Sequence, residues 1–127
     1  MKNPRSRQLR SLIYLAAGYF SINFALAINS AISKNFFVNE LSFDAFQIGV
    51  LESIREIPGL LSAFVMGSIL HFSHSLLAGV FLLIFSTGIG GMSTVNSWIH
   101  VVPWLFIWSI GFHSWVPPSS SITLSLS

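Results

Sequence analysis

Long apolar runs separated by short polar stretches divide the chain into four segments. A helix needs about 20 mainly apolar residues, each adding about 1.5 Å, to cross a hydrocarbon core about 30 Å thick. Segments of that length cover residues 12–33, 46–70, 76–95 and 98–120. The pattern therefore predicts an all-α, polytopic membrane protein with about four transmembrane helices in a single unit, residues 1–127.

Polar stretches mark the ends of the predicted helices. Residues 34–44 carry both signs of charge and end the first helix, and tight polar turns follow at 71–75 and 96–97. The Pro117-Pro118 pair lacks two amide hydrogens and crowds the preceding turn, so we expect it to kink or end the last helix. The pattern leaves open whether a helix resumes in the segment SSSITLSLS that follows.

Composition strengthens the assignment to a membrane. The chain is 53% hydrophobic and only 8% charged, and all ten charged residues precede Ile57. The stretch from Ile57 to Ser127 has no Asp, Glu, Lys or Arg, so lipid or other protein must cover it. This excludes a soluble monomer. The absence of cysteine excludes a disulfide framework and a thiolate metal site.

The charges also predict an orientation. Four of the six basic residues lie in the first ten positions, whereas Lys34 after the first span is offset by Glu40 and Asp44. The positive-inside rule then places the N-terminus in the cytoplasm, and four crossings return the C-terminus there. We expect a multi-pass protein of the bacterial inner (plasma) membrane. No basic face follows the N-terminal cluster, so no nucleic-acid partner is expected. The N-terminal cluster is Lys2, Arg5, Arg7 and Arg10.

A cleaved signal peptide is a competing interpretation of the N-terminus. A basic region precedes an apolar stretch, and Ala25-Leu26-Ala27 is similar to a small-residue cleavage site. However, Ser21 and Asn23 interrupt the apolar region, which is also long for a signal. A retained transmembrane helix is therefore the preferred interpretation.

Three charged residues lie inside the second predicted span. Glu56 is ten residues past Phe46, which is about 15 Å of helix and close to the membrane midplane. Glu52, Arg55 and Glu56 share one side of the helix, and two carboxylates beside one guanidinium leave a net negative charge. Charged groups at this depth usually face a bundle interior or a wet cavity, which predicts a substrate or proton site. The alternative is a structural ion pair that holds this helix to a neighbour.

Small residues and a proline follow the charged group. Pro58-Gly59 frees a backbone carbonyl and allows a bend, as either a functional hinge or a tolerated kink. Gly59, Ala63 and Gly67 repeat every four residues, a pattern that lets helices approach closely in lipid. We expect this face to pack against another helix, within the chain or in a missing partner.

Asn23 and His113 are further candidates for a polar pathway. Both would lie near mid-depth in the first and last spans. The alternative role is an interhelical hydrogen bond, worth about 0.6 kcal/mol on average in membranes.

Other possible motifs carry little chemistry. His71 and His74 lack a third ligand nearby, so a polar turn is favoured and no metal or cofactor is expected. Gly88, Gly90 and Gly91 lie inside a predicted span, where they indicate close packing or a flexible helix end. No nucleophile motif or catalytic ordering is present, so an enzyme is not expected.

Two segments resemble the opening of a major facilitator superfamily transporter. One is FQIGVLESIREIPGLLSAFVMGSIL, which follows a basic N-terminus and a polar loop and precedes a very short turn. The other is WLFIWSIGFHSWVPPSSSITLSL, which is similar to the family's fourth helix, where a glycine pair or Gly-x-Gly near mid-helix precedes a proline and a run of small residues. The resemblance covers almost the whole chain.

The chain departs from the family pattern in two places. The family's loop between helices two and three usually reads G-x-L-a-D-r-x-G-r-k, to which Gly67 and Ile69 correspond. His71 and His74 occupy the acidic and second glycine positions, and the basic residues are absent, so the loop lacks a gating salt bridge of the family type. Ile107 stands where many proton antiporters of the family carry arginine, which argues against a drug:proton antiporter.

The resemblance implies an architecture and a function. Family members have twelve helices in two six-helix halves, with the substrate near the midplane. Helices one and four would line the cavity, helix two would flank the partner half, and helix three would lie outside. We therefore expect the N-terminal part of a secondary transporter of a small solute, truncated in its gene or sequence record and inactive without its C-terminal helices. The alternative is a stand-alone four-helix interaction or assembly subunit, or a small oligomeric channel.

Overall fold

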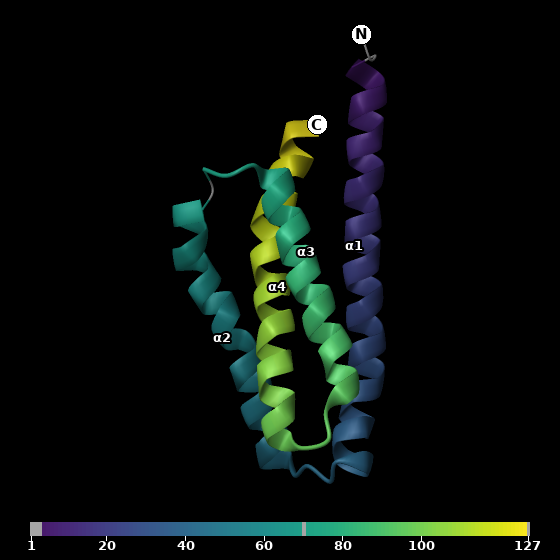
Figure 1. Ribbon diagram of the computed structural model, residues 1–127, viewed down its shortest axis with the longest axis vertical. Coiled ribbons are helices and arrows are strands. Elements are labelled where there is room, and N and C mark those ends of the chain that lie inside the picture. The colour runs from purple at the N-terminus through teal and green to yellow at the C-terminus, as the bar shows by residue number, and fades with distance from the viewer. Residues whose placement is uncertain (1–3, 70, 127) are drawn as a thin grey trace.

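The computed structural model describes residues 4–69 and 71–126, which form four long helices and contain no strand (Figure 1). Two short helical turns, η1 and η2, extend α1 and α3. The predicted all-α fold is confirmed for this part of the chain. The basic residue Lys2 lies outside it. The elements are α1 (Pro4–Asn35), η1 (Phe36–Glu40), α2 (Ala45–Ile69), α3 (His74–Gly91), η2 (Met92–Thr94) and α4 (Trp98–Leu126).

Three stretches of helix among the described residues are long and apolar enough to cross a membrane. They are Arg5–Glu40, His74–Thr94 and Trp98–Ser125. Helix α2 has 25 residues, but every stretch of 18 residues within it contains the three charged side chains at positions 52, 55 and 56. All four helices are therefore long enough to cross a membrane, but only three of them also have a low enough charge.

Helices α3 and α4 form the tightest pair. A β-carbon at Gly88 would lie 2.3 Å from the amide nitrogen of Trp108, and one at Gly111 would lie 2.3 Å from that of Phe85. Only glycine allows the two backbones to come so close. Gly88 and Gly91 at the end of α3 thus serve close packing, with Gly91 placed under the ring of Trp104, whereas a β-carbon at Gly90 would meet nothing within 4 Å.

Helix α2 packs on α4 along its first half and as far as Gly59, which contacts His113. The indole Nε1 of Trp98 donates to the carbonyl of Gln47 at 3.4 Å, and Ser109 Oγ donates to the carbonyl of Arg55. Pro58 follows, buried within the helix and lacking an amide hydrogen. Beyond it α2 inclines away from α4 (Figure 1), and large side chains such as Phe64 are exposed.

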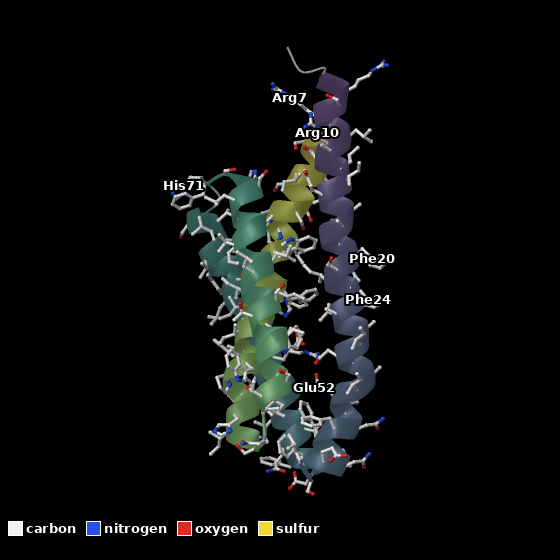
Figure 2. The ribbon with its side chains drawn as sticks, turned by 45° about the vertical axis from the view of Figure 1, so that its right-hand side comes forward. Arg7, Arg10, Phe20, Phe24, Glu52 and His71 are labelled. Atoms are coloured by element: carbon white, nitrogen blue, oxygen red, sulfur yellow. The ribbon has the colours of Figure 1, made fainter. Side chains whose placement is uncertain are left out.

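Helix α1 lies beside α3 and α4 and contacts them sparsely (Figure 1). Tyr19 packs edge-on against Trp115 with ring centroids 4.5 Å apart, and its hydroxyl lies 3.3 Å from Ser119 Oγ. Ile22 is buried, but Phe20 and Phe24 point outward from the bundle (Figure 2). Most of the apolar surface of α1 is therefore available to lipid or to another protein.

The first helix continues where the sequence indicated a loop. The chain remains helical to Glu40 through the π-helical turn η1, in which the Leu41 amide donates to the Phe36 carbonyl at 3.1 Å. Phe37 and Phe43 are buried and stacked with centroids 5.5 Å apart. This aromatic contact stabilises a short connection, and the polar side chains stay on its surface.

The last helix does not end at its proline pair. Helix α4 continues through Pro117 and Pro118 to Leu126. Hydroxyls of the following small residues bond to carbonyls of the same helix, including Ser121 Oγ to Pro117 at 3.1 Å and Thr123 Oγ1 to Ser119 at 2.9 Å. Neighbouring helices and such hydroxyl groups allow proline within apolar helices.

Candidate functional site: a polar cavity between α1, α2 and α4

A cavity of about 590 Å³ lies between the end of α1, the start of α2 and the middle of α4. Its walls are partly apolar, with contributions from Leu26, Phe37, Leu105 and Phe112. Glu52 extends into this region in Figure 2. The polar lining residues are Asn29, Ser30, Ser33 and Lys34 from α1, Glu52, Arg55 and Glu56 from α2, and His113 from α4.

The centre of the polar lining is an ion-paired group on α2. Arg55 Nη1 lies 2.6 Å from Glu52 Oε2, and Arg55 Nη2 lies 2.8 Å from Glu56 Oε1. Arg55 Nε also donates to Glu56 Oε1 at 3.0 Å. One guanidinium thus neutralises one of two carboxylates, as the spacing along α2 predicted, and each carboxylate keeps one oxygen that Arg55 does not engage.

His113 connects this group to α4. Its Nε2 lies 3.9 Å from Glu56 Oε2, and its ring packs against the backbone of Gly59. A β-carbon at Gly59 would lie 2.9 Å from His113 Cε1, so a larger residue there would displace the ring. The small residue after Pro58 therefore has a local purpose, which is to admit a histidine beside the carboxylate.

Two buried residues of α4 lie at the side of the cavity that this helix forms. Ser109 is fully buried and bonds to the carbonyl of Arg55, which fixes the backbone of the ion-paired group against α4. Trp108 is 5% exposed, lines the cavity, and packs edge-on against Phe85 with centroids 6.3 Å apart. Its indole Nε1 is buried without a hydrogen-bond partner among the described residues. An unmet donor in such a place is costly and calls for an explanation.

The structure brings together four of the five predicted pathway residues. Glu52, Arg55, Glu56 and His113 line one cavity, although they come from two helices. Asn23 does not join them, because its Nδ2 donates to the Tyr19 carbonyl of its own helix at 2.8 Å and its side chain is exposed.

The predicted small-residue face is only partly used within the chain. Gly59 packs against His113, whereas Ala63 and Gly67 are exposed. A β-carbon at Gly67 would meet no heavy atom within 4 Å. Ala63 and Gly67 therefore do not pack against another helix among the described residues, because α2 inclines away from α4 after Pro58. Packing of this face against a missing partner, the other possibility, stays a prediction.

Sequence reasoning expects the first helix to line the cavity but does not single out the residues of α1 that do so. These are Asn29, Ser30, Ser33 and Lys34, of which the polar pattern assigns Lys34 to a loop. The available signal was their spacing, since Asn29 and Ser33, like Ser30 and Lys34, are four apart and share a helix face. The apolar run ends at Lys34, so the four-residue spacing was divided between a predicted helix and a predicted loop.

Histidines and carboxylates elsewhere do not assemble further. Among residues 4–69 and 71–126, no group of three or more His, Asp or Glu side chains is arranged to hold a metal ion. His71 lies exposed at the end of α2, with its ring centroid 4.0 Å from that of Phe72. The cavity is thus the place where polar chemistry is concentrated.

Comparison with protein-family models, with curated proteins and with solved structures finds no match to this chain. The resemblance to the major facilitator superfamily therefore stays an expectation from sequence motifs. The cavity and the apolar helices around it are therefore the basis for assigning a function.

Proposed function

We propose that this chain is a multi-pass membrane protein that forms part of a pathway for a small solute, as the N-terminal helices of a secondary transporter. The observation that carries the proposal is the cavity in which two carboxylates, a guanidinium, a histidine and a lysine meet among apolar helices. Ionisable groups inside membrane bundles are rare and usually serve solute or proton movement. An enzymatic role is not part of the proposal.

The ion-paired group suits coupling to protons. Glu56 engages Arg55 through Oε1 and faces His113 through Oε2. A proton added to Glu56 would remove its charge and weaken its attraction for Arg55, leaving the guanidinium paired with Glu52 alone. Such a change alters the charge of the cavity that a solute meets. Alternating access would further require helices that rock against this unit.

Cysteine accessibility tests the membrane and pathway parts of the proposal together. The chain has no cysteine, so single-cysteine variants report one position each. In proteoliposomes, Asn29→Cys and Ser33→Cys should react with a charged methanethiosulfonate that does not cross lipid. The matched variant Phe20→Cys lies on the outward face of the same helix and should not react. Unreactive cavity positions, or equal reactivity at all three positions, would contradict the proposal.

The second candidate is a stand-alone interaction subunit or a small oligomeric channel. It is favoured by the exposed apolar face of α1, where Phe20 and Phe24 stack with centroids 5.6 Å apart. Solute-selective leakage from liposomes that contain only this chain would support a channel. Intact liposomes, combined with an accessible cavity, would support the transporter interpretation.

We propose the inner membrane of a bacterium as the location, because the basic start of α1 suits retention on the cytoplasmic side. Arg7 and Arg10 extend from the N-terminal end of α1, beyond the other helices (Figure 2). Fractionation of cells that express the tagged chain checks this assignment, and recovery in the soluble fraction would contradict it.

A further inference from the structure

We infer that the cavity takes a small zwitterion, a solute carrying one carboxylate and one ammonium group close to an apolar side chain. This inference rests on the proposed function and concerns the ligand of the same cavity. It follows from which polar groups of the cavity the chain itself leaves unmatched.

On the donor side, Lys34 has no partner. It lines the cavity and makes no hydrogen bond or ion pair with any residue that the structure describes. Its ammonium group suits a carboxylate, which accepts several hydrogen bonds at once.

On the acceptor side, two carboxylate oxygens remain. Arg55 engages Glu52 through Oε2 and Glu56 through Oε1. The second oxygen of Glu52 contacts no donor among residues 4–69 and 71–126, and that of Glu56 has only His113, at 3.9 Å. An ammonium group has three donors and suits such a pair of oxygens.

The charge balance argues against a simple ion. Lys34 and Arg55 offset Glu52 and Glu56, so the formal charges of these four lining residues sum to zero. A lone anion or cation would leave one unbalanced charge in the cavity. A zwitterion adds no net charge and satisfies both sets of groups, and the apolar walls formed by Leu105 and Phe112 accommodate its side chain.

Three probes that share the branched alkyl chain of leucine test the inference. Leucine carries both charged groups, 4-methylpentanoate lacks the amine, and 3-methylbutylamine lacks the carboxylate. Equilibrium dialysis would use the purified chain in phosphatidylglycerol nanodiscs. We expect leucine to bind at least about tenfold more tightly than either partial probe, the factor that corresponds to about 1.4 kcal/mol. Equal binding of the three, preference for a partial probe, or no binding would overturn the inference.

Charge-neutralising variants identify the contacts. Lys34→Gln should remove the tighter binding of leucine relative to 3-methylbutylamine, which lacks the carboxylate. Glu52→Gln should reduce the tighter binding of leucine relative to 4-methylpentanoate, which lacks the amine. The controls Arg7→Gln and Glu40→Gln make the same charge changes away from the cavity and should preserve both advantages. If the controls lower binding as much as the cavity variants do, the cavity is not the binding site.

A lipid headgroup is the other source of a zwitterion. Phosphatidylethanolamine combines an ammonium group with a phosphate, so its addition to the nanodiscs is a necessary arm of the experiment. Leucine binding should be unchanged by it. Loss of leucine binding would assign the cavity to lipid and overturn the inference of a free solute.

The experiments test the inferred zwitterion and the proposed solute pathway separately. Reactive cysteines at positions 29 and 33 with no preference for leucine would leave the pathway standing and reject the zwitterion. Unreactive cysteines would reject the pathway, whatever the probes show.

Discussion

Gly88 of α3 and Trp108 of α4 meet backbone to backbone, because a β-carbon on Gly88 would lie 2.3 Å from the Trp108 amide nitrogen. The same Trp108 forms one wall of the polar cavity. The position of that wall therefore depends on a glycine that lies outside the cavity. Packing between α3 and α4 and the shape of the cavity are coupled through this contact.

Gly88→Ala should destabilise the chain. The added methyl meets backbone, which cannot rotate away, so the helices must separate at a cost of about 1–3 kcal/mol. Unfolding by denaturant in micelles, followed by circular dichroism, measures this change. The matched control is Gly90→Ala, two residues away on the same helix, where a β-carbon meets nothing within 4 Å. Equal stability of the two variants would contradict the close contact.

Ser109→Ala should loosen α2 from α4 at the ion-paired group. It removes the bond from the buried hydroxyl to the carbonyl of Arg55, and such bonds contribute about 0.6 kcal/mol on average and up to about 1.7 in membranes. Ser53→Ala is the control, since Ser53 is exposed and bonds only to Gly49 of its own helix. Faster amide hydrogen exchange around Arg55 in the first variant alone is the expected result.

Glu56→Gln should abolish the pH dependence of solute uptake while leaving expression intact. The amide keeps the size of the side chain but cannot take up a proton as the carboxylate does. Uptake is to be measured across a pH series in cells that contain the complete assembly. Glu40→Gln serves as the control, because Glu40 does not line the cavity. Unchanged pH dependence in the Glu56 variant would remove the coupling role and leave a structural ion pair.

Gly67→Leu should block association with a partner helix without lowering the stability of the chain itself. Gly67 is exposed and its β-carbon position is empty, so the chain itself should keep its stability. If a partner helix packs against Ala63 and Gly67, the leucine should block that association. Crosslinking between this chain and its partner, or between copies, measures it. Gly59→Ala provides the contrast, because it should displace His113 without affecting association.

Reporter fusions at the two ends test the orientation. The N-terminal end of α1 and the C-terminal end of α4 lie at the same end of the bundle (Figure 1), so both reporters should report the cytoplasm. Replacing Arg5, Arg7 and Arg10 by glutamine should weaken this preference. Reporters on opposite sides would show an odd number of crossings, with α2 the helix to reconsider because of its charge.

Part of the site could be predicted from the sequence, because three of its charged residues lie on one helix, α2. Arg55 pairs with the adjacent Glu56 although sequence neighbours do not face each other on a helix. The three-residue spacing of Glu52 and Arg55, in contrast, places them on neighbouring positions whatever the tertiary structure, so that pair was predictable. The position of Asn23 was not, because its amide turned to its own backbone instead of toward the other helices. A helical period tells which residues share a face but not which face is covered.

The sequence by itself determined the helices, the apolar character of three of them and the internal ion pairs of α2, because these depend on local spacing and composition. Only the tertiary structure decided which helices touch. It placed His113 against Gly59, placed Lys34 in the lining of the same cavity as the charged group of α2, and left Ala63 and Gly67 uncovered. The reason is physical: contacts between helices depend on where backbones can approach, and glycine and proline set that through packing over many residues.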